Sequence, residues 1–117
     1  VARRDNKTKE SVSLDGIDVH IQNLLEDIQS NLLNRAKQFR QDHLTIANSY
    51  DELKEALDKK GGFVLAHWDG TTETELLVKE ETKATIRCIP LDGEMEEGTC
   101  IITGKPSKQR VIFARAY

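Results

Sequence analysis

Two cysteines and three histidines are the side chains in this sequence that could support nucleophilic or redox chemistry. A cysteine nucleophile needs a base within reach and a lowered pKa. His20, His43 and His67 are scattered along the chain, and no helix-start pattern precedes either cysteine. We therefore interpret Cys88 and Cys100 as thiols of the protein core, with Cys88 a small buried residue of a strand.

The segment 103–107 (TGKPS) has a faint likeness to a phosphate-binding loop. It lacks the G-x-x-x-x-G-K-[ST] spacing, and no helix is predicted after it, so the elements that cradle a phosphate are not in place. Gly104 and Pro106 instead favour a tight turn between two strands.

Basic residues gather in two places, where they could contact phosphates. The formal net charge of −3 excludes a global basic field, and few aromatic residues accompany these side chains. We interpret them as ordinary surface residues, so the sequence alone does not predict nucleic-acid binding. The two groups are Arg3, Arg4, Lys7 and Lys9, and Arg35, Lys37 and Arg40.

The composition is that of a folded protein of modest size. The 117 residues fit either one domain or one small domain with an extension, and a content of 38% hydrophobic and 32% charged residues excludes a disordered chain. Four acids lie within 92–97, whereas the following tail is basic. We expect a solvated acidic loop that faces a basic strand edge. The basic residues of the tail are Lys105, Lys108, Arg110 and Arg115.

No targeting signal is evident. The first ten residues, VARRDNKTKE, are charged and lack the apolar centre of a secretory signal. No apolar run approaches the ~20 residues that a membrane span needs. We expect a cytoplasmic location, no membrane partner and reduced cysteines. Because Val1 lies in a β-compatible run, we also expect the chain to be part of a longer protein.

The first half of the chain predicts a hairpin and one long helix. Residues 1–14 contain two β-compatible runs, VARR and ESVSL, separated by the turn-forming residues DNKT. Residues 15–48 form a connector in which apolar residues recur every three or four positions and predict a helix of roughly 25 residues. Its apolar face comprises Ile17, Ile21, Leu24, Leu25, Ile28, Leu32, Leu33, Ala36 and Phe39.

Residues 49–117 predict a two-layer α+β module, a small mixed sheet with helices on one face. Ser49–Glu52 and Thr72–Glu75 have the capping-box spacing that starts a helix. Leu53, Ala56 and Leu57 form the inner face of the first helix, and Gly61 and Gly62 end it. The predicted strands are FVLAHW (63–68), TIRCI (85–89), GTCIIT (98–103) and RVIFARAY (110–117).

Three runs resemble the C-terminal part of prolyl-tRNA synthetases of the archaeal and eukaryotic type. They are LLEDIQSNLLNRAKQFR, ETKATIRCIP and GKPSKQRVIFARAY, in that order and spacing. Under this resemblance, 1–14 is the last hairpin of the anticodon-binding domain and 15–48 is a connector. Residues 49–117 are then a module like the family's zinc-binding module.

The resemblance implies that the family's zinc site is degenerate in this chain. The four family cysteine positions fall on Asp69, Thr74, Cys100 and Thr103. Structural zinc needs four ligands such as thiolate and imidazole, and threonine hydroxyls are poor ones. We therefore expect a metal-free pocket filled by hydrogen bonds. A mixed site of His67, Asp69 and Cys100 is the weaker alternative.

The resemblance implies a supporting role in an enzyme that attaches proline to tRNA(Pro) in two ATP-dependent steps. None of the ATP, proline or adenylate residues matches this chain, so the catalytic domain is expected elsewhere in the same protein. The whole enzyme would need ATP and Mg²⁺, bind tRNA(Pro) and form a homodimer. Tyr117 matches the family's terminal tyrosine, which points toward the active site.

Two other functions stay open. The chain could be a stand-alone α+β module that binds RNA or the ribosome, in which case the N-terminal hairpin should have a complete sheet to join. An independent hydrolase or redox enzyme is the third possibility, and it lacks a convergent set of polar residues.

Overall fold

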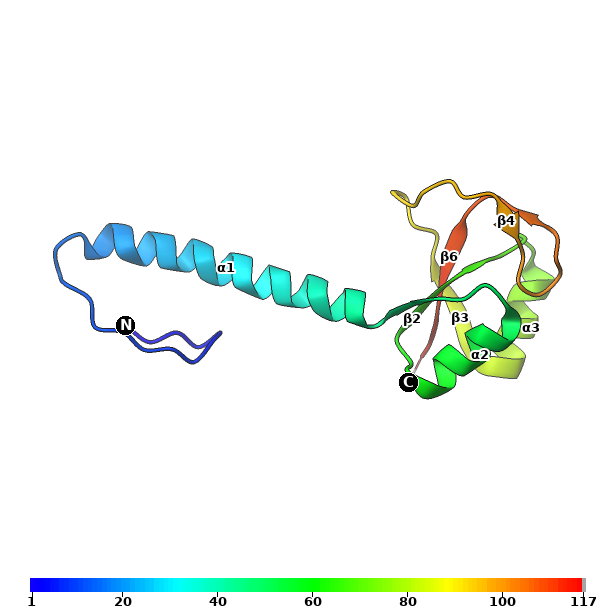
Figure 1. Ribbon diagram of the computed structural model, residues 1–117, viewed down its shortest axis with the longest axis horizontal. Coiled ribbons are helices and arrows are strands. Elements are labelled where there is room, and N and C mark those ends of the chain that lie inside the picture. The colour runs from blue at the N-terminus through cyan, green and yellow to red at the C-terminus, as the bar shows by residue number, and fades with distance from the viewer. Residues whose placement is uncertain (117) are drawn as a thin grey trace. The chain divides into compact units, whose positions relative to one another are not determined.

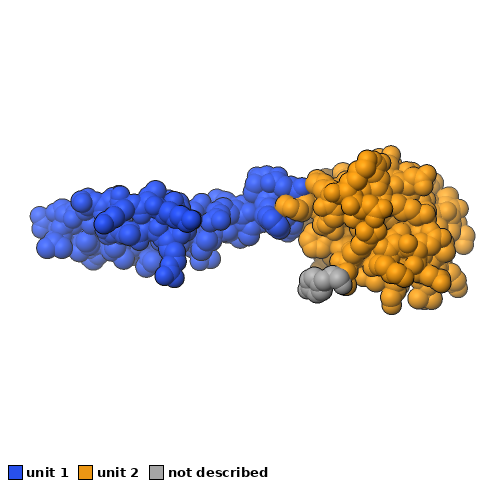
Figure 2. All heavy atoms as spheres, turned by 90° about the horizontal axis from the view of Figure 1, so that it is seen from below, with its two compact units in different colours: residues 1–42 blue, residues 43–117 orange. Residues whose placement is uncertain are grey.

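The chain divides into two compact units between Asp42 and His43 (Figure 2). The computed structural model describes residues 1–116. The boundary falls inside the expected connector 15–48, because Leu44–Ile46 does not continue the helix and instead forms strand β1. This strand belongs to the sheet of the second unit.

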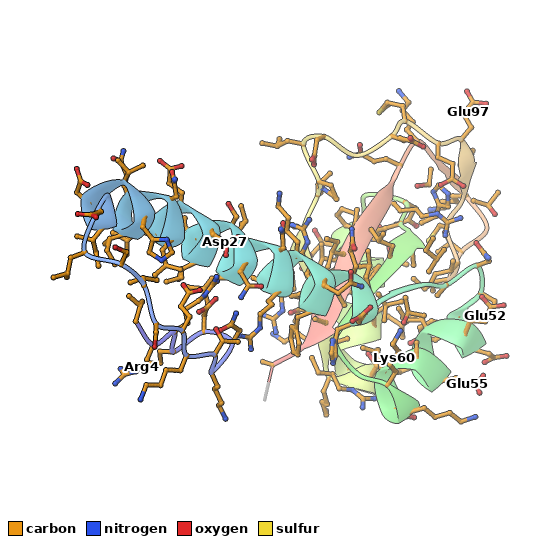
Figure 3. All side chains as sticks on the ribbon, turned by 60° about the vertical axis from the view of Figure 1, so that its left-hand side comes forward. Arg4, Asp27, Glu52, Glu55, Lys60 and Glu97 are labelled. Carbon is orange, nitrogen blue, oxygen red and sulfur yellow. The ribbon has the colours of Figure 1, made fainter. Side chains whose placement is uncertain are left out.

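The first unit is a short hairpin held against helix α1 (Ile17–Asp42). The backbone turns back earlier than predicted, since Ala2 pairs with Lys9 and the run ESVSL forms no strand. The carboxylate of Asp5 is 3% exposed and accepts hydrogen bonds from Arg3 (2.8 Å) and from Asn31 of α1 (2.6 Å). Arg4, from the same hairpin, is exposed and points away from α1 (Figure 3).

The second unit contains a four-stranded mixed sheet with the order β1-β2-β6-β3 (Figure 1). Strand β2 (Phe63–His67) runs parallel to β1, while β6 (Arg110–Arg115) is antiparallel to both β2 and β3 (Ala84–Cys88). A separate two-stranded sheet joins β4 (Gly98–Thr99) to β5 (Pro106–Ser107).

One face of the four-stranded sheet is covered by helices α2 (Tyr50–Lys59) and α3 (Thr72–Thr82) (Figure 1). The register pairs Val64 with Phe113 and Ala66 with Val111, so these side chains share that face. They form a core with residues of both helices, which confirms the predicted two-layer architecture. The buried core includes Leu53, Leu57, Val64, Ala66, Val78, Ala84, Val111 and Phe113.

Both covering helices begin at side-chain caps. Ser49 Oγ accepts from Glu52 N at 3.2 Å, and Glu52 returns a carboxylate to the backbone N–H of Asn48. The predicted cap of α3 is displaced by one residue. Thr71, not Thr72, is the N-cap and accepts from the backbone N–H of Thr74.

Arg115 secures the other ends of the same helices. Its guanidinium donates to Thr82 O at the end of α3 (2.7 Å) and to Leu57 O in the last turn of α2 (3.3 Å). It also pairs with Asp58 at 2.6 Å. A cation at the C-terminus of a helix interacts favourably with the unpaired carbonyls and the helix dipole.

Two predictions about the strands are wrong. The run GTCIIT forms only the two-residue strand β4, because Ile101–Thr103 turn back toward β5. Cys88 lies on β3 as predicted but is exposed, whereas Cys100 is buried.

Within the part of the chain that the structure describes, no helix has the length and apolar character to cross a membrane.

Replacement of Thr45 by valine is expected to stabilise the second unit. Thr45 Oγ1 in β1 is buried and has no hydrogen-bond partner among the described residues. A buried hydroxyl without a partner costs free energy that an apolar group of the same shape does not. Thr45→Val should raise the free energy of unfolding by about 1 kcal/mol, as measured by urea denaturation.

Thr45→Ser is the matched control, because it keeps the unpaired hydroxyl and removes the methyl group. It should lower stability. A valine variant that is no more stable than the parent protein would contradict the assignment.

Candidate functional site

The candidate site is built around Asp69, which lies between the end of β2 and the start of α3. Gly70 has a φ of 79°, a conformation that glycine adopts readily, and lets the chain turn directly after Asp69. Asp69 Oδ1 then accepts from the backbone N–H of Thr71 (3.1 Å) and from its hydroxyl (2.8 Å). This Asx turn sets the start of α3.

Two further threonines reach the same carboxylate from other elements. Thr74, in the first turn of α3, donates its hydroxyl to Asp69 Oδ1 at 2.5 Å. Thr103, in the turn between β4 and β5, donates to Asp69 Oδ2 at 2.9 Å. One carboxylate thus ties together the sheet, a helix and a hairpin that are far apart in the sequence.

The hydrogen bonds change the acidity of Asp69. Burial alone would raise the pKa of this carboxyl group. Hydrogen bonds from Thr74, Thr71 and Thr103 favour the ionised form more strongly and hold the pKa of Asp69 well below its usual range. The group is therefore a carboxylate at neutral pH, and it acts as an acceptor for the surrounding hydroxyls.

Cys100 shapes the turn that delivers Thr103. Its side chain is 2% exposed, its backbone N–H donates to Lys105 O (2.8 Å), and its carbonyl accepts from Gly104 N (2.9 Å). These bonds close a tight loop around residues 100–105. The next residue, Ile101, donates its N–H to His67 O at 3.2 Å, which anchors the loop to β2.

The structure thus brings Asp69, Thr74 and Thr103 into one network, with Cys100 in the same turn as Thr103. The donor set of these four positions is one carboxylate, two hydroxyls and one thiol. Zinc sites are built from thiolates and imidazoles, so this set does not fit a structural zinc ion. Within residues 1–116, no group of three His, Cys, Asp or Glu side chains is arranged to hold a metal ion. The alternative site of His67, Asp69 and Cys100 is therefore not formed.

A second polar cluster around His67 did not emerge from the sequence. His67 is 5% exposed, and its Nδ1 lies 3.0 Å from the hydroxyl oxygen of Ser107. That hydroxyl donates its one proton to Gln109 O (3.0 Å), so Nδ1 must be the donor toward Ser107. The serine hydroxyl is therefore fully used in the fold, and the pair is not arranged as a nucleophile with its base.

The acidic loop closes over this histidine. Glu96 lies 3.9 Å from His67 Nε2 and forms a bidentate pair with Arg110 of β6 (2.8 and 3.1 Å). The Arg110 guanidinium lowers the pKa of Glu96. Gly98 packs on the imidazole, since a Cβ atom there would lie 2.3 Å from His67 Nε2. The sequence predicts that the acidic loop 92–97 faces a basic strand edge, and Glu96 makes this contact through Arg110. Glu97 points away from the sheet (Figure 3).

Tyr117 lies outside the described residues, so the expectation that it faces an active site stays a prediction.

His20 pairs with Glu10 in the first unit (3.1 Å), far along the chain from the cysteines. Asp69, His67, Glu96 and Arg110 are engaged in hydrogen bonds or ion pairs within the fold. The geometry of the candidate site therefore supports a structural role.

Replacement of Asp69 by asparagine is expected to destabilise the second unit and to flatten its acid denaturation. Because the pKa is lowered in the folded state, the stability that Asp69 contributes is fully present above its ordinary pKa of 3.8 and is lost as the pH falls below it. Asp69→Asn should cost about 1–2 kcal/mol at pH 7 and remove this part of the pH dependence.

The measurement is urea denaturation at several pH values between about 7 and 2. Asp92→Asn is a matched control, because it makes the same change in charge at a residue that is exposed in the acidic loop. Identical acid profiles for Asp69→Asn and the parent protein would show that the network does not stabilise the fold.

Comparisons with known proteins find relatives that match the whole length of this chain. The sequence model of the family described as "Prolyl-tRNA synthetase, C-terminal" matches residues 50–117. The chain is 58% identical over 117 residues to the proline–tRNA ligase of Porphyromonas gingivalis, spanning 100% of this chain and 24% of that protein. The proline–tRNA ligase of Bacteroides fragilis is 56% identical over 121 residues, again with 24% of the relative covered.

A solved structure shares the fold across both units. It is the prolyl-tRNA synthetase of Cryptosporidium parvum, described as complexed with L-proline and AMP, with a TM-score of 0.90 and 30% sequence identity. The match covers 99% of this chain and 25% of the other. The chain thus spans about a quarter of the length of the relatives it matches. Since the family match extends over more than half of its residues, the chain belongs to the prolyl-tRNA synthetase C-terminal family.

Proposed function

We propose that this chain is the C-terminal part of a proline–tRNA ligase, which activates proline with ATP and transfers it to tRNA(Pro). The observation that carries the proposal is the 58% identity to the Porphyromonas gingivalis ligase across every residue of the chain. The activity would reside in the remaining three quarters of the protein, which holds the catalytic domain and the rest of the anticodon-binding domain. The full-length enzyme would require ATP and Mg²⁺ and form a homodimer in the cytoplasm.

The contribution of this chain to that enzyme would be structural. Asp69 is saturated by threonine hydroxyls, and His67 is held by Ser107 under the acidic loop, so neither is available to a substrate. The alternative of a stand-alone RNA- or ribosome-binding module is not favoured, because the relatives carry this sequence as about a quarter of a longer ligase.

We further propose that the enzyme is of the archaeal and eukaryotic type and that its module has replaced the family's zinc by the Asp69 network. The likeness to a eukaryotic synthetase at a TM-score of 0.90 supports the first part. The second part is supported by the meeting of Asp69, Thr74 and Thr103, which are three of the four positions where the resemblance expects cysteine. A carboxylate that accepts hydrogen bonds from several hydroxyl groups joins the same elements that a metal would join.

The full-length polypeptide should catalyse proline-dependent ATP–pyrophosphate exchange, and the 117-residue chain alone should not. The reason is that the sequence of this chain matches none of the family's motifs for binding ATP, proline or the adenylate. The measurement is the exchange rate of each purified protein with and without proline. Exchange by the chain alone above a blank, or its absence from the full-length protein, would overturn the proposal.

The chain should contain no stoichiometric zinc when produced in zinc-supplemented medium. Elemental analysis of the dialysed protein is the measurement. The triple variant Asp69→Cys, Thr74→Cys, Thr103→Cys is the matched control, because with Cys100 it supplies four thiolates and should bind about one zinc per chain. One zinc per chain in the parent protein would show that other ligands had been recruited.

A further inference from the structure

The sequence contains three Asp–Gly pairs, at 15–16, 69–70 and 92–93. Such a pair can rearrange without an enzyme, because glycine has no side chain to block the approach of its backbone nitrogen to the preceding aspartate. The rearrangement needs a carboxyl group that is free to turn and a backbone that is free to bend. The structure gives the three pairs very different freedom in both respects.

The reaction has two steps and needs no reactant other than water. The backbone nitrogen of glycine attacks the side-chain carbonyl carbon Cγ of aspartate, a C–N bond forms, and one water leaves, which gives a cyclic imide. Water then adds back to the imide. Addition at Cγ restores aspartate, whereas addition at the main-chain carbonyl gives isoaspartate, in which the main chain runs through the side chain and the α-carboxylate is free.

Asp92 and Gly93 meet both conditions. They are exposed and lie between β3 and β4, in the segment 89–97, which forms neither helix nor strand (Figure 1). Within residues 1–116, no hydrogen bond or ion pair holds the Asp92 carboxylate. The backbone N–H of Gly93 donates to Pro90 O at 3.3 Å, which is a long contact at the surface. Opening of such a segment costs little free energy, because few buried contacts are lost.

Asp69 meets neither condition, although Gly70 follows it. Three hydroxyl groups hold both oxygens of its carboxylate, and they belong to Thr71, Thr74 and Thr103. Turning Cγ toward the backbone nitrogen of Gly70 would break hydrogen bonds to a helix and to a hairpin at once. The same hydrogen bonds hold the pKa of Asp69 well below its usual range, and an ionised carboxylate is a poor target for a nitrogen nucleophile.

The pair Asp15–Gly16 is exposed like 92–93, but its backbone is held on both sides. The N–H of Asp15 donates to Ser13 Oγ at 3.2 Å, and the carbonyl of Gly16 accepts from the N–H of His20 at 3.0 Å. The second bond belongs to the start of α1, so the helix must fray before this pair can bend. Exposure is therefore matched between the two pairs, and only the restraint on the backbone differs.

We propose that Asp92 is a site of spontaneous isoaspartate formation and that the threonine network protects Asp69 from the same reaction. The product at position 92 is a free carboxylate on a main chain that has gained one carbon. This group is the substrate of the class of enzymes that methylate isoaspartate with S-adenosylmethionine. The acidic loop is thus a modification site whose chemistry does not depend on the ligase activity.

The test is to age the full-length polypeptide at neutral pH and physiological temperature and then to map isoaspartate. Cleavage after lysine and arginine places the three pairs on different peptides. Transfer of a labelled methyl group by an isoaspartate methyltransferase then measures each peptide. The peptide with Asp92 should carry more than about tenfold as much label as the peptide with Asp69, and the peptide with Asp15 should lie between them.

The variant Asp92→Glu is the matched control, because it keeps the negative charge but its longer side chain disfavours the five-membered imide. Its peptide should carry no label. The second control is ageing in guanidinium chloride, where the restraints of the fold are gone and the three pairs should react at similar rates.

Two results would contradict the proposal. The first is a folded protein in which Asp15 or Asp69 forms as much isoaspartate as Asp92, or in which Asp92 forms none. The second is slow reaction of Asp69 that persists in guanidinium chloride, since the threonine network would then not be the cause of its protection.

Discussion

The antiparallel pairing of β2 with β6 is the constraint on which the rest of the second unit depends. Its register decides which side chains point toward the helices and which point away. Val64 and Phe113 meet in the core, Leu65 and Ile112 meet on the opposite face of the sheet, and the pair of His67 and Arg110 lies where the acidic loop returns. A shift of β6 by one residue would exchange the two faces of that strand and bury Arg110 under the helices.

The two arginines at the ends of β6 extend this constraint into the surrounding structure. Arg110 and Arg115 are five positions apart, so their side chains project from opposite faces of the strand. Arg115 donates to the carbonyls at the ends of both helices. Arg110 holds the acidic loop through Glu96 and the end of β1 through Ala47 O. One strand thus joins the helix layer to the loops on the other side.

Periodicity and capping residues predicted much of the fold. The apolar spacing of α1, the cap at Ser49 and the alternation of β6 all lead to the observed elements, because each is a local pattern. The strand β1 and the exposed position of Cys88 could not be predicted, because each depends on a neighbour distant in sequence. The sequence predicted the Asp69 network only in outline, because the family resemblance marked its residues as former metal-ligand positions but gave no hydrogen-bond partners. The His67 cluster was missed, since no spacing links residues 67, 96 and 107.

The place of β6 in the sheet also has a consequence for biosynthesis. The strand lies between β2 and β3, yet it is the last of the three to leave the ribosome. While residues 110–115 are still unmade, β2 and β3 have no strand between them and the core lacks Val111 and Phe113. The module therefore completes its fold only after residues 110–115 have been translated. A chain truncated before residue 110 has unpaired edges on β2 and β3, and unpaired strand edges promote aggregation.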